Sequence, residues 1–179
     1  MRLAGESRVR PKSAALDMAE FCRGEHPKLV GVLTLYTGDR DLAEELAQDV
    51  IVRVISNWTA VSRADSPGAW THRVAINVAN SWFRRALAGQ RATAKLEARG
   101  TTPNQPANDA DGLALRQAVA QLPQRQRTAI VLRYYADLPS SEVAAIMGCK
   151  DGTVWALVHQ AIVALRRTPG FEAMEAPDV

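Results

Sequence analysis

Apolar residues recur at three- and four-residue spacing in three long blocks of this chain, and that period limits the choice of fold more than any other feature. The blocks run from Leu16 to Val61, from Trp70 to Leu87 and from Leu113 to Leu165. Spacing of this kind places apolar side chains on one face of an α-helix. No segment bounded by turns alternates apolar and polar residues as a half-buried strand would. The sequence therefore predicts an all-α protein.

A polar segment separates the second block from the third. Residues 98–112, ARGTTPNQPANDADG, are rich in Pro, Asn, Asp, Thr and Gly and show no apolar period, which is the composition of a linker. A chain of 179 residues can form one domain with a full core or two small ones, and the linker favours two. The predicted parts are a basic tail at 1–12, a helical domain at 13–91, a flexible linker at 92–111, a helix-turn-helix domain at 112–168 and a C-terminal tail at 169–179.

The composition excludes several classes of protein. Apolar residues make up 47% of the chain, which is ordinary for a folded protein, and no apolar run approaches the roughly 20 residues of a membrane-spanning helix. The N-terminus has basic residues but lacks the apolar core of a secretion signal. Cys22 and Cys149 are far apart, and only His26 stands near Cys22, so neither a disulfide nor a metal site is expected. We expect a cytoplasmic protein without membrane insertion or a metal site.

The charges form blocks along the chain, although the net charge is only +3. Residues 13–60 contain four basic and eight acidic residues, whereas residues 61–99 contain seven basic and two acidic ones. Neighbouring blocks of opposite sign indicate two binding partners of opposite charge, and the basic block would suit a phosphate backbone. Two solvated faces without a partner are the alternative.

The acidic block contains an amphipathic helix, DRDLAEELAQDVIVRVISNW at 39–58, which opens on an Asp suited to an N-cap. At about 100° per residue, its apolar stripe turns inward and a largely acidic arc of roughly 80° turns outward. The apolar Val52 inside an acidic rim favours a docking surface for a basic protein, and a plain solvated face is the alternative. The outward arc contains Asp41, Glu45, Gln48, Asp49 and Val52.

The basic block contains a second amphipathic helix, which begins at Ser66-Pro67, a sequence typical of a helix start. One arc of about 100° is polar, while the opposite side is apolar. This side includes Trp82, which we expect to pack, and His72, which we expect to pack or to lie at the rim. Asparagines are poor helix formers, so their presence in the polar arc indicates a function. Amides can contact base edges while arginines contact phosphates, and the polar loop before the helix could border a flipped base. The arc contains Trp70, Arg73, Asn77, Asn80, Ser81 and Arg84.

The third block ends in the pattern of a helix-turn-helix, GCKDGTVWALVHQAIVALRR at 148–167. Gly148 follows an apolar helix, and Asp151-Gly152-Thr153 opens the next one, which has no Lys or Arg between Lys150 and Arg166. The preceding helices instead supply most of the positive charge of this domain. If the motif binds DNA, we therefore expect those helices to contact the phosphate backbone and the second helix of the motif to contact the bases. The arginines concerned are Arg116, Arg125, Arg127 and Arg133.

These segments, in this order and with this gap, resemble the bacterial RNA polymerase sigma factors of the sigma-70 superfamily, in particular the small extracytoplasmic-function (ECF) group. The resemblance rests on HPKLVGVLTLYTGDRDLAEELAQDVIVRVISNW, SPGAWTHRVAINVANSWFRR and LRQAVAQLPQRQRTAIVLRYYADLPSSEVAAIMGCKDGTVWALVHQAIVALRR. It implies a non-catalytic subunit that binds core RNA polymerase, recognises the −35 and −10 elements of promoter DNA and stabilises strand opening. It also implies an anti-sigma protein as a partner, and no cofactor.

The resemblance assigns three surfaces to positions of this sequence. The acidic helix resembles the main contact with the clamp of core polymerase, formed here by Asp41, Glu45, Gln48, Asp49 and Val52. The loop and the basic helix resemble the part that captures the non-template strand of the −10 element, formed here by Ser62, Arg63, Asp65, Trp70, Arg73, Asn77, Asn80, Arg84 and Arg85. The helix-turn-helix domain resembles the part that binds the −35 element, formed here by Arg125, Arg127, Arg133, Thr153, Ala156, His159, Gln160 and Arg167.

The second helix of the helix-turn-helix departs from the family. After Gly-Thr-Val the family commonly has a Lys-Ser-Arg-like run, where this chain has Trp155, Ala156 and Leu157. Two other interpretations therefore stay open: a stand-alone helix-turn-helix regulator, and an interaction module that binds core polymerase or an anti-sigma protein without efficient −35 recognition. A hydrolytic enzyme has the least support, because no P-loop, nucleophile with its base or pair of acid–base carboxylates is recognisable.

Overall fold

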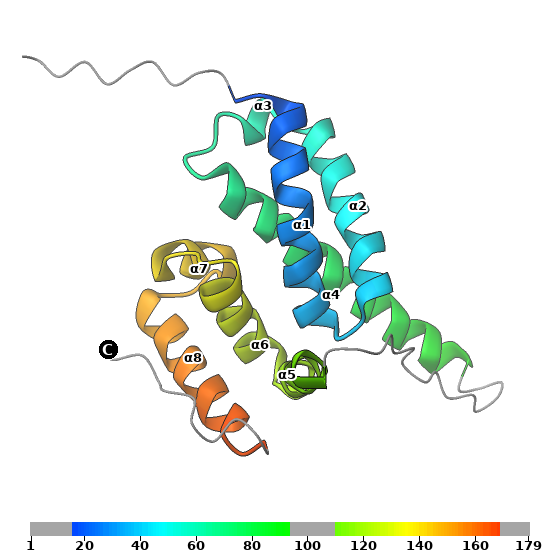
Figure 1. Cartoon of the computed structure of the whole chain (residues 1–179), viewed down its shortest axis with the longest axis vertical. Helices are drawn as coiled ribbons and strands as arrows, with labels where there is room; N and C mark the ends of the chain where they lie inside the picture. The colour runs from blue at the N-terminus through cyan, green and yellow to red at the C-terminus, as the bar shows by residue number, and fades with distance from the viewer. Residues whose placement is uncertain (1–15, 94–109, 169–179) are drawn as a thin grey trace, which may run out of the picture.

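The computed structural model describes residues 16–93 and 110–168, and this described part is helical, without a strand. The predicted all-α fold with two small domains is confirmed, and Figure 1 shows the two groups of helices side by side. The predicted tails at 1–12 and 169–179 lie outside the described residues, as does most of the predicted linker. The first domain contains α1 (Met18–Thr37), α2 (Arg40–Ser56), α3 (Trp58–Val61) and α4 (Pro67–Thr93). The second contains α5 (Ala110–Gln121), α6 (Gln124–Ile130), the π-helical turn η1 (Val131–Tyr135), α7 (Ser140–Met147) and α8 (Asp151–Leu165).

Local residues determine where the helices of the first domain begin and end. Gly38 closes α1 in the left-handed region at φ 80°, a conformation that favours glycine. Asp39 then caps α2, because its carboxylate accepts a hydrogen bond from the backbone N–H of Leu42 at 3.0 Å. Ser66 lies just before α4, where its hydroxyl accepts from the backbone N–H three residues on at 3.3 Å, and Pro67 is the first residue of the helix. Both predicted helix starts, at Asp39 and at Ser66, are therefore confirmed.

The helices α1, α2 and α4 pack around a shared apolar core. Leu33 of α1, Leu46 and Val50 of α2 and Ala79 of α4 are almost completely buried in it. Each buried leucine or valine contributes about 1.5–3 kcal/mol relative to an exposed one. Burial of the apolar stripe of α2 fixes the rotation of this helix, so that its acidic arc points to solvent.

The second domain contains an irregular turn between α6 and α7. In η1 the backbone hydrogen bonds widen, and the N–H of Ala136 donates to the carbonyl of Val131 at 3.1 Å. Asp137 follows with φ 51°, and the next helix begins at Ser140. The wide turn leaves Tyr135 about half exposed, on the side of the domain that faces α1.

The two domains touch directly in this structure. Helix α1 packs against α5 and η1, while α4 packs against α7. The buried apolar residues of both domains form one continuous cluster. The sequence analysis predicted two domains joined by a linker and did not predict this contact between them.

Candidate functional site

The acidic arc of α2 lies on the surface, as predicted. All five of its members are exposed, and Val52 has 62% of its surface open to solvent. The neighbouring Ile55 is 47% exposed and was missed in the sequence, although its place three residues after Val52 was a usable signal. Within the described residues, the carboxylates of Asp41, Glu45 and Asp49 have no ion-pair partner on the chain itself. This face therefore presents free negative charge around an apolar centre.

The packing of α4 leaves part of its polar arc exposed and part of it half-buried. Arg73, Asn77 and Arg84 are exposed, and so is Arg85 beside the arc. On the opposite side Ala75 and Ala79 are buried, and the half-buried Trp82 packs edge-on against the neighbouring Phe83 with ring centroids 5.3 Å apart. Exposed amides and guanidinium groups on one helix face can contact base edges and phosphates, respectively.

The loop before α4 adds polar groups close to the start of that helix. Arg63 and Asp65 are exposed, while Ser62 and Trp70 are half-buried. Trp70 packs against the buried core, and part of its surface is accessible to solvent. An aromatic ring in this position can stack on an unpaired base.

Asn80 differs from the other predicted members of the arc because it faces the second domain. Its Oδ1 accepts hydrogen bonds from the hydroxyl of Tyr36 and from Nε2 of Gln124, both at 2.7 Å. Its side chain is half-buried. The amide oxygen is therefore occupied in this arrangement, and a contact of Asn80 with DNA remains a prediction.

A buried pair of polar side chains lies at the inner side of α4. His72 is 3% exposed and Glu25 is 7% exposed, with 4.0 Å between Nε2 of His72 and Oε2 of Glu25. The other carboxylate oxygen of Glu25 accepts from Nζ of Lys28 at 2.9 Å. Burial lowers the pKa of His72, and the coulombic attraction of Glu25 opposes that shift. Of the two predicted places for His72, packed or at the rim, the structure shows the packed one.

The helix-turn-helix consists of α7, a turn at Gly148 and α8. Gly148 ends α7 in the left-handed region at φ 62°. The inner side of α8 is buried through Val154, Val158 and Ile162. Its outer side is exposed and nearly uncharged up to Arg167 at its end. The exposed members of the predicted −35 set in or just after this helix are Thr153, Ala156, His159, Gln160 and Arg167.

The arginines before α8 have different surroundings. Arg125 is exposed and available for a phosphate contact. Arg133 is half-buried, with its guanidinium 5.8 Å from the ring centroid of Tyr134 and 5.7 Å from that of Trp155. Arg127 donates hydrogen bonds to backbone carbonyls, and its pKa is lowered chiefly by burial. The sequence analysis treated these three arginines as equivalent. Within the described residues, Arg125 is the one of the three without a hydrogen bond to a carbonyl or a contact with an aromatic ring.

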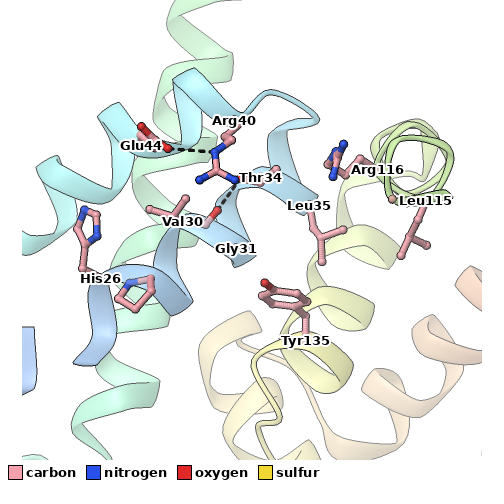
Figure 2. Close-up of a pocket in the computed structure, with 12 residues that line it drawn as sticks. His26, Val30, Gly31, Thr34, Leu35, Arg40, Glu44, Leu115, Arg116 and Tyr135 are labelled. Carbon is pink, nitrogen blue, oxygen red and sulfur yellow. Dashed lines mark hydrogen bonds and ion pairs between the residues drawn. The ribbon is translucent and has the colours of Figure 1, made fainter. Parts of the chain in front are cut away.

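A shallow pocket of about 520 Å³ lies where the two domains meet. Figure 2 shows Tyr135 of η1 pointing toward Gly31 of α1, with the ion pair of Arg40 and Glu44 on the far wall.

The described residues contain no group of three or more His, Cys, Asp or Glu side chains placed to hold a metal ion. Among the described helices, none is both long and apolar enough to cross a membrane.

Comparisons with known proteins find sigma factor sequences similar to both domains. A family profile described as Sigma-70 region 2 matches residues 22–88, and one described as Sigma-70, region 4 matches residues 112–165. The RNA polymerase sigma-E factor of Streptomyces antibioticus is 30% identical over 125 residues, which cover 69% of this chain and 68% of that protein. The ECF RNA polymerase sigma factor SigL of Mycobacterium tuberculosis is 29% identical over 169 residues, which cover 89% and 95%. The sigma factor RpoE of Bartonella quintana, crystallised with the anti-sigma factor NepR, is 22% identical with a TM-score of 0.74, over 85% of this chain and 96% of that one.

Proposed function

This chain belongs to the ECF group of RNA polymerase sigma factors, and from that premise we propose how its surfaces direct transcription initiation at specific promoters. The chain binds core RNA polymerase, recognises the −35 and −10 elements and stabilises strand opening. The observation that supports this most directly is the pairing of two exposed faces in one small domain. An acidic face with an apolar centre lies on α2, and an Arg- and Asn-rich face lies on α4, which packs against α2.

The acidic face of α2 is the docking surface for core polymerase. Asp41, Glu45 and Asp49 supply negative charge that is not neutralised by the described part of the chain. Complementary charge speeds the encounter with a basic partner and sets the orientation of the complex. Burial of Val52 and Ile55 at the centre would supply apolar area, which is how interface centres usually stabilise binding.

The loop at 62–65 and the exposed face of α4 hold the non-template strand of the −10 element. Arg73, Arg84 and Arg85 are exposed cations for phosphates, and Asn77 is an exposed amide for a base edge. The half-buried Trp70 supplies a surface for stacking on an unpaired base. Stacking of this type contributes about 1–3 kcal/mol per base.

The helix-turn-helix binds the −35 element with few charges on its second helix. Ala156 can contact a thymine methyl group, and His159 and Gln160 can reach base edges. Arg125 and Arg167 are exposed and suited to phosphates. The nearly uncharged face of α8 also supports a second candidate function, in which the chain binds core polymerase or an inhibitor without efficient −35 recognition.

The partners follow from the same surfaces. Phosphodiester chemistry belongs to core polymerase, so the chain itself acts as a non-catalytic initiation factor in the cytoplasm. The structurally similar sigma factor from Bartonella quintana was solved with an anti-sigma factor. We propose that a protein of this class also binds the present chain and controls its access to polymerase.

Charge reversal on α2 tests the docking surface. Glu45→Lys combined with Asp49→Lys should abolish assembly with core polymerase, measured by co-migration in size-exclusion chromatography. Glu20→Lys, an exposed acid in α1 outside the arc, is the matched control and should assemble normally. Assembly of the doubly reversed chain at the wild-type level would contradict the proposed surface.

Alanine variants test the DNA-binding face. Asn77→Ala and Arg84→Ala alter exposed residues, so the fold and holoenzyme assembly should be preserved. Open-complex formation, followed by permanganate reactivity of unpaired thymines, should fall in both variants. Full strand opening by both would show that α4 does not hold the melted strand.

A further inference from the structure

Helix α8 has few polar side chains with which to distinguish bases, and Gln160 is the one carboxamide among them. The exposed face of the helix also carries Ala156 and His159, and its residues Asp151–Leu165 include no Lys or Arg. A carboxamide has both a donor and an acceptor, so the base that it recognises depends on which of the two faces the DNA. The surroundings of the Gln160 amide therefore decide what this helix can recognise.

A second glutamine, Gln126 of α6, holds this amide in one orientation. Nε2 of Gln126 donates to Oε1 of Gln160 at 3.2 Å, which is within the usual range for such a bond. Gln126 is half-buried, whereas Gln160 is exposed. Helix α6 packs against α8, and Ala129 and Ile130, on the same side of α6 as Gln126, are buried. Gln126 therefore extends from the rim of a packed pair of helices.

The bond leaves Gln160 with a defined set of free hydrogen-bonding groups. A carboxamide has two N–H donors and an oxygen with two lone pairs. Gln126 uses one lone pair of Oε1, and within the described residues Nε2 of Gln160 donates to no protein acceptor. The oxygen is thus tied to α6, and the two N–H groups and one lone pair are left for a ligand.

Adenine is the base whose major-groove edge suits this set. It presents an acceptor, N7, next to a donor, the N6 amino group. One N–H of Gln160 can donate to N7 while the remaining lone pair of Oε1 accepts from N6. Guanine presents two acceptors, so its O6 would meet the amide oxygen. Cytosine presents only a donor, which would leave the N–H groups of Gln160 without an acceptor.

We propose that Gln126 is a positioning residue that orients Gln160, and that the pair makes the chain select adenine at one base pair of the −35 element. This inference rests on the proposed function, because it names a base that the helix-turn-helix recognises. A free glutamine side chain loses its rotational freedom on binding, whereas one already held by Gln126 loses less. The bond also prevents the amide from turning over and presenting its oxygen to cytosine.

Holoenzymes assembled from core polymerase and the full-length chain test the pair on promoter fragments with a randomised −35 element. Sequencing of the bound and unbound fragments gives the relative affinity for each base at each position. The base pair recognised by Gln160 is the one whose preference is lost in Gln160→Ala. Gln121→Ala, which changes an exposed glutamine at the end of α5, is the matched control. The informative variants are Gln126→Ala and Gln126→Glu.

At that base pair, the wild-type and Gln121→Ala holoenzymes should prefer adenine over cytosine by roughly 5- to 150-fold, the range of one bidentate contact. Gln126→Ala should reduce this ratio several-fold and leave the preferences at other positions unchanged. Gln126→Glu should move the ratio further toward cytosine, because a carboxylate can only accept. It would bind Nε2 of Gln160 and turn the amide oxygen toward the DNA. The added negative charge weakens binding to every sequence, so its effect cancels in the ratio.

A wild-type ratio that persists in both Gln126 variants overturns the positioning role. Equal loss of preference at every position of the element also overturns it, because that result belongs to a damaged domain. A preference for another base at the Gln160 position overturns the selection of adenine. If Gln160→Ala leaves a clear −35 preference unchanged, the inference fails while the proposed function stands. A wild-type holoenzyme without any −35 preference contradicts the proposed −35 recognition itself, and the inference fails with it.

Discussion

Replacing Val52 with Thr tests whether the apolar centre of the α2 face is buried by core polymerase. Val and Thr have nearly the same shape, and Val52 is 62% exposed in the free chain. Substitutions at exposed positions of this kind usually change the free energy of unfolding by less than about 0.5 kcal/mol. The variant should therefore fold normally, and any loss of affinity for core polymerase then reflects a change in the contacts of the complex.

The size of the expected loss follows from the exposed fraction of Val52. Burial of one methyl group contributes about 0.8 kcal/mol, and burial of a hydroxyl without a hydrogen-bond partner costs about 1–3 kcal/mol. Since 62% of the surface of Val52 is still open to solvent in the free chain, docking should impose about that share of the combined free-energy cost. We expect binding to core polymerase to weaken by roughly 1–2.5 kcal/mol, which is about 5- to 70-fold in Kd.

Fluorescence anisotropy of the labelled full-length chain, titrated with core polymerase, measures this Kd directly. Leu16→Thr is the control, because Leu16 is also exposed, at 41%, but lies before α1 and outside the α2 face. Its Kd should equal that of the wild-type chain. A Kd of Val52→Thr within twofold of wild type, or an equal loss in Leu16→Thr, would refute a specific role for the apolar centre.

Three further predictions concern single side chains. Burial lowers the pKa of His72, so the unfolded chain binds more protons than the folded chain below about pH 6.5. The free energy of unfolding, measured by urea titration, should therefore fall as the pH falls from 7.5 to 5.5. His72→Phe should reduce that fall, and His159→Gln, at an exposed position, should not. Equal slopes of the free energy of unfolding against pH in the two variants would contradict the burial effect. Arg125→Gln should reduce the slope of log affinity against log salt by about one on −35 duplexes of any sequence, since it removes one phosphate contact. Arg127→Lys should lower the free energy of unfolding by about 2 kcal/mol in urea titrations, because a Lys cannot reproduce the forked hydrogen bonds to carbonyls.

The features that could be predicted from the sequence are those with local causes. The start of α2 at Asp39 and the start of α4 at Ser66 depend on side chains that bond to backbone groups three residues away. The outward direction of Val52 depends only on the helical period and on the burial of the opposite stripe. Such features are encoded within one helix, so periodicity and capping residues were sufficient.

The features that could not be predicted depend on contacts between segments far apart in the chain. Helical arithmetic gives Asn80 a direction, but it cannot say that Gln124 of the other domain lies in that direction. Arg127 was counted as a phosphate ligand because of its charge, whereas its hydrogen bonds in this structure go to carbonyls. One signal was available: Gly31 within an apolar helical block indicates a close approach of another segment, although not which segment.

Run-off transcription with purified core polymerase on a promoter library tests the central claim most directly. Core polymerase alone should give no promoter-specific products. Addition of the wild-type chain should give discrete start sites whose upstream sequences share one −35 and one −10 element, and the Glu45→Lys/Asp49→Lys chain should give none of them. A wild-type chain that binds core polymerase yet yields no shared promoter sequence would contradict the account.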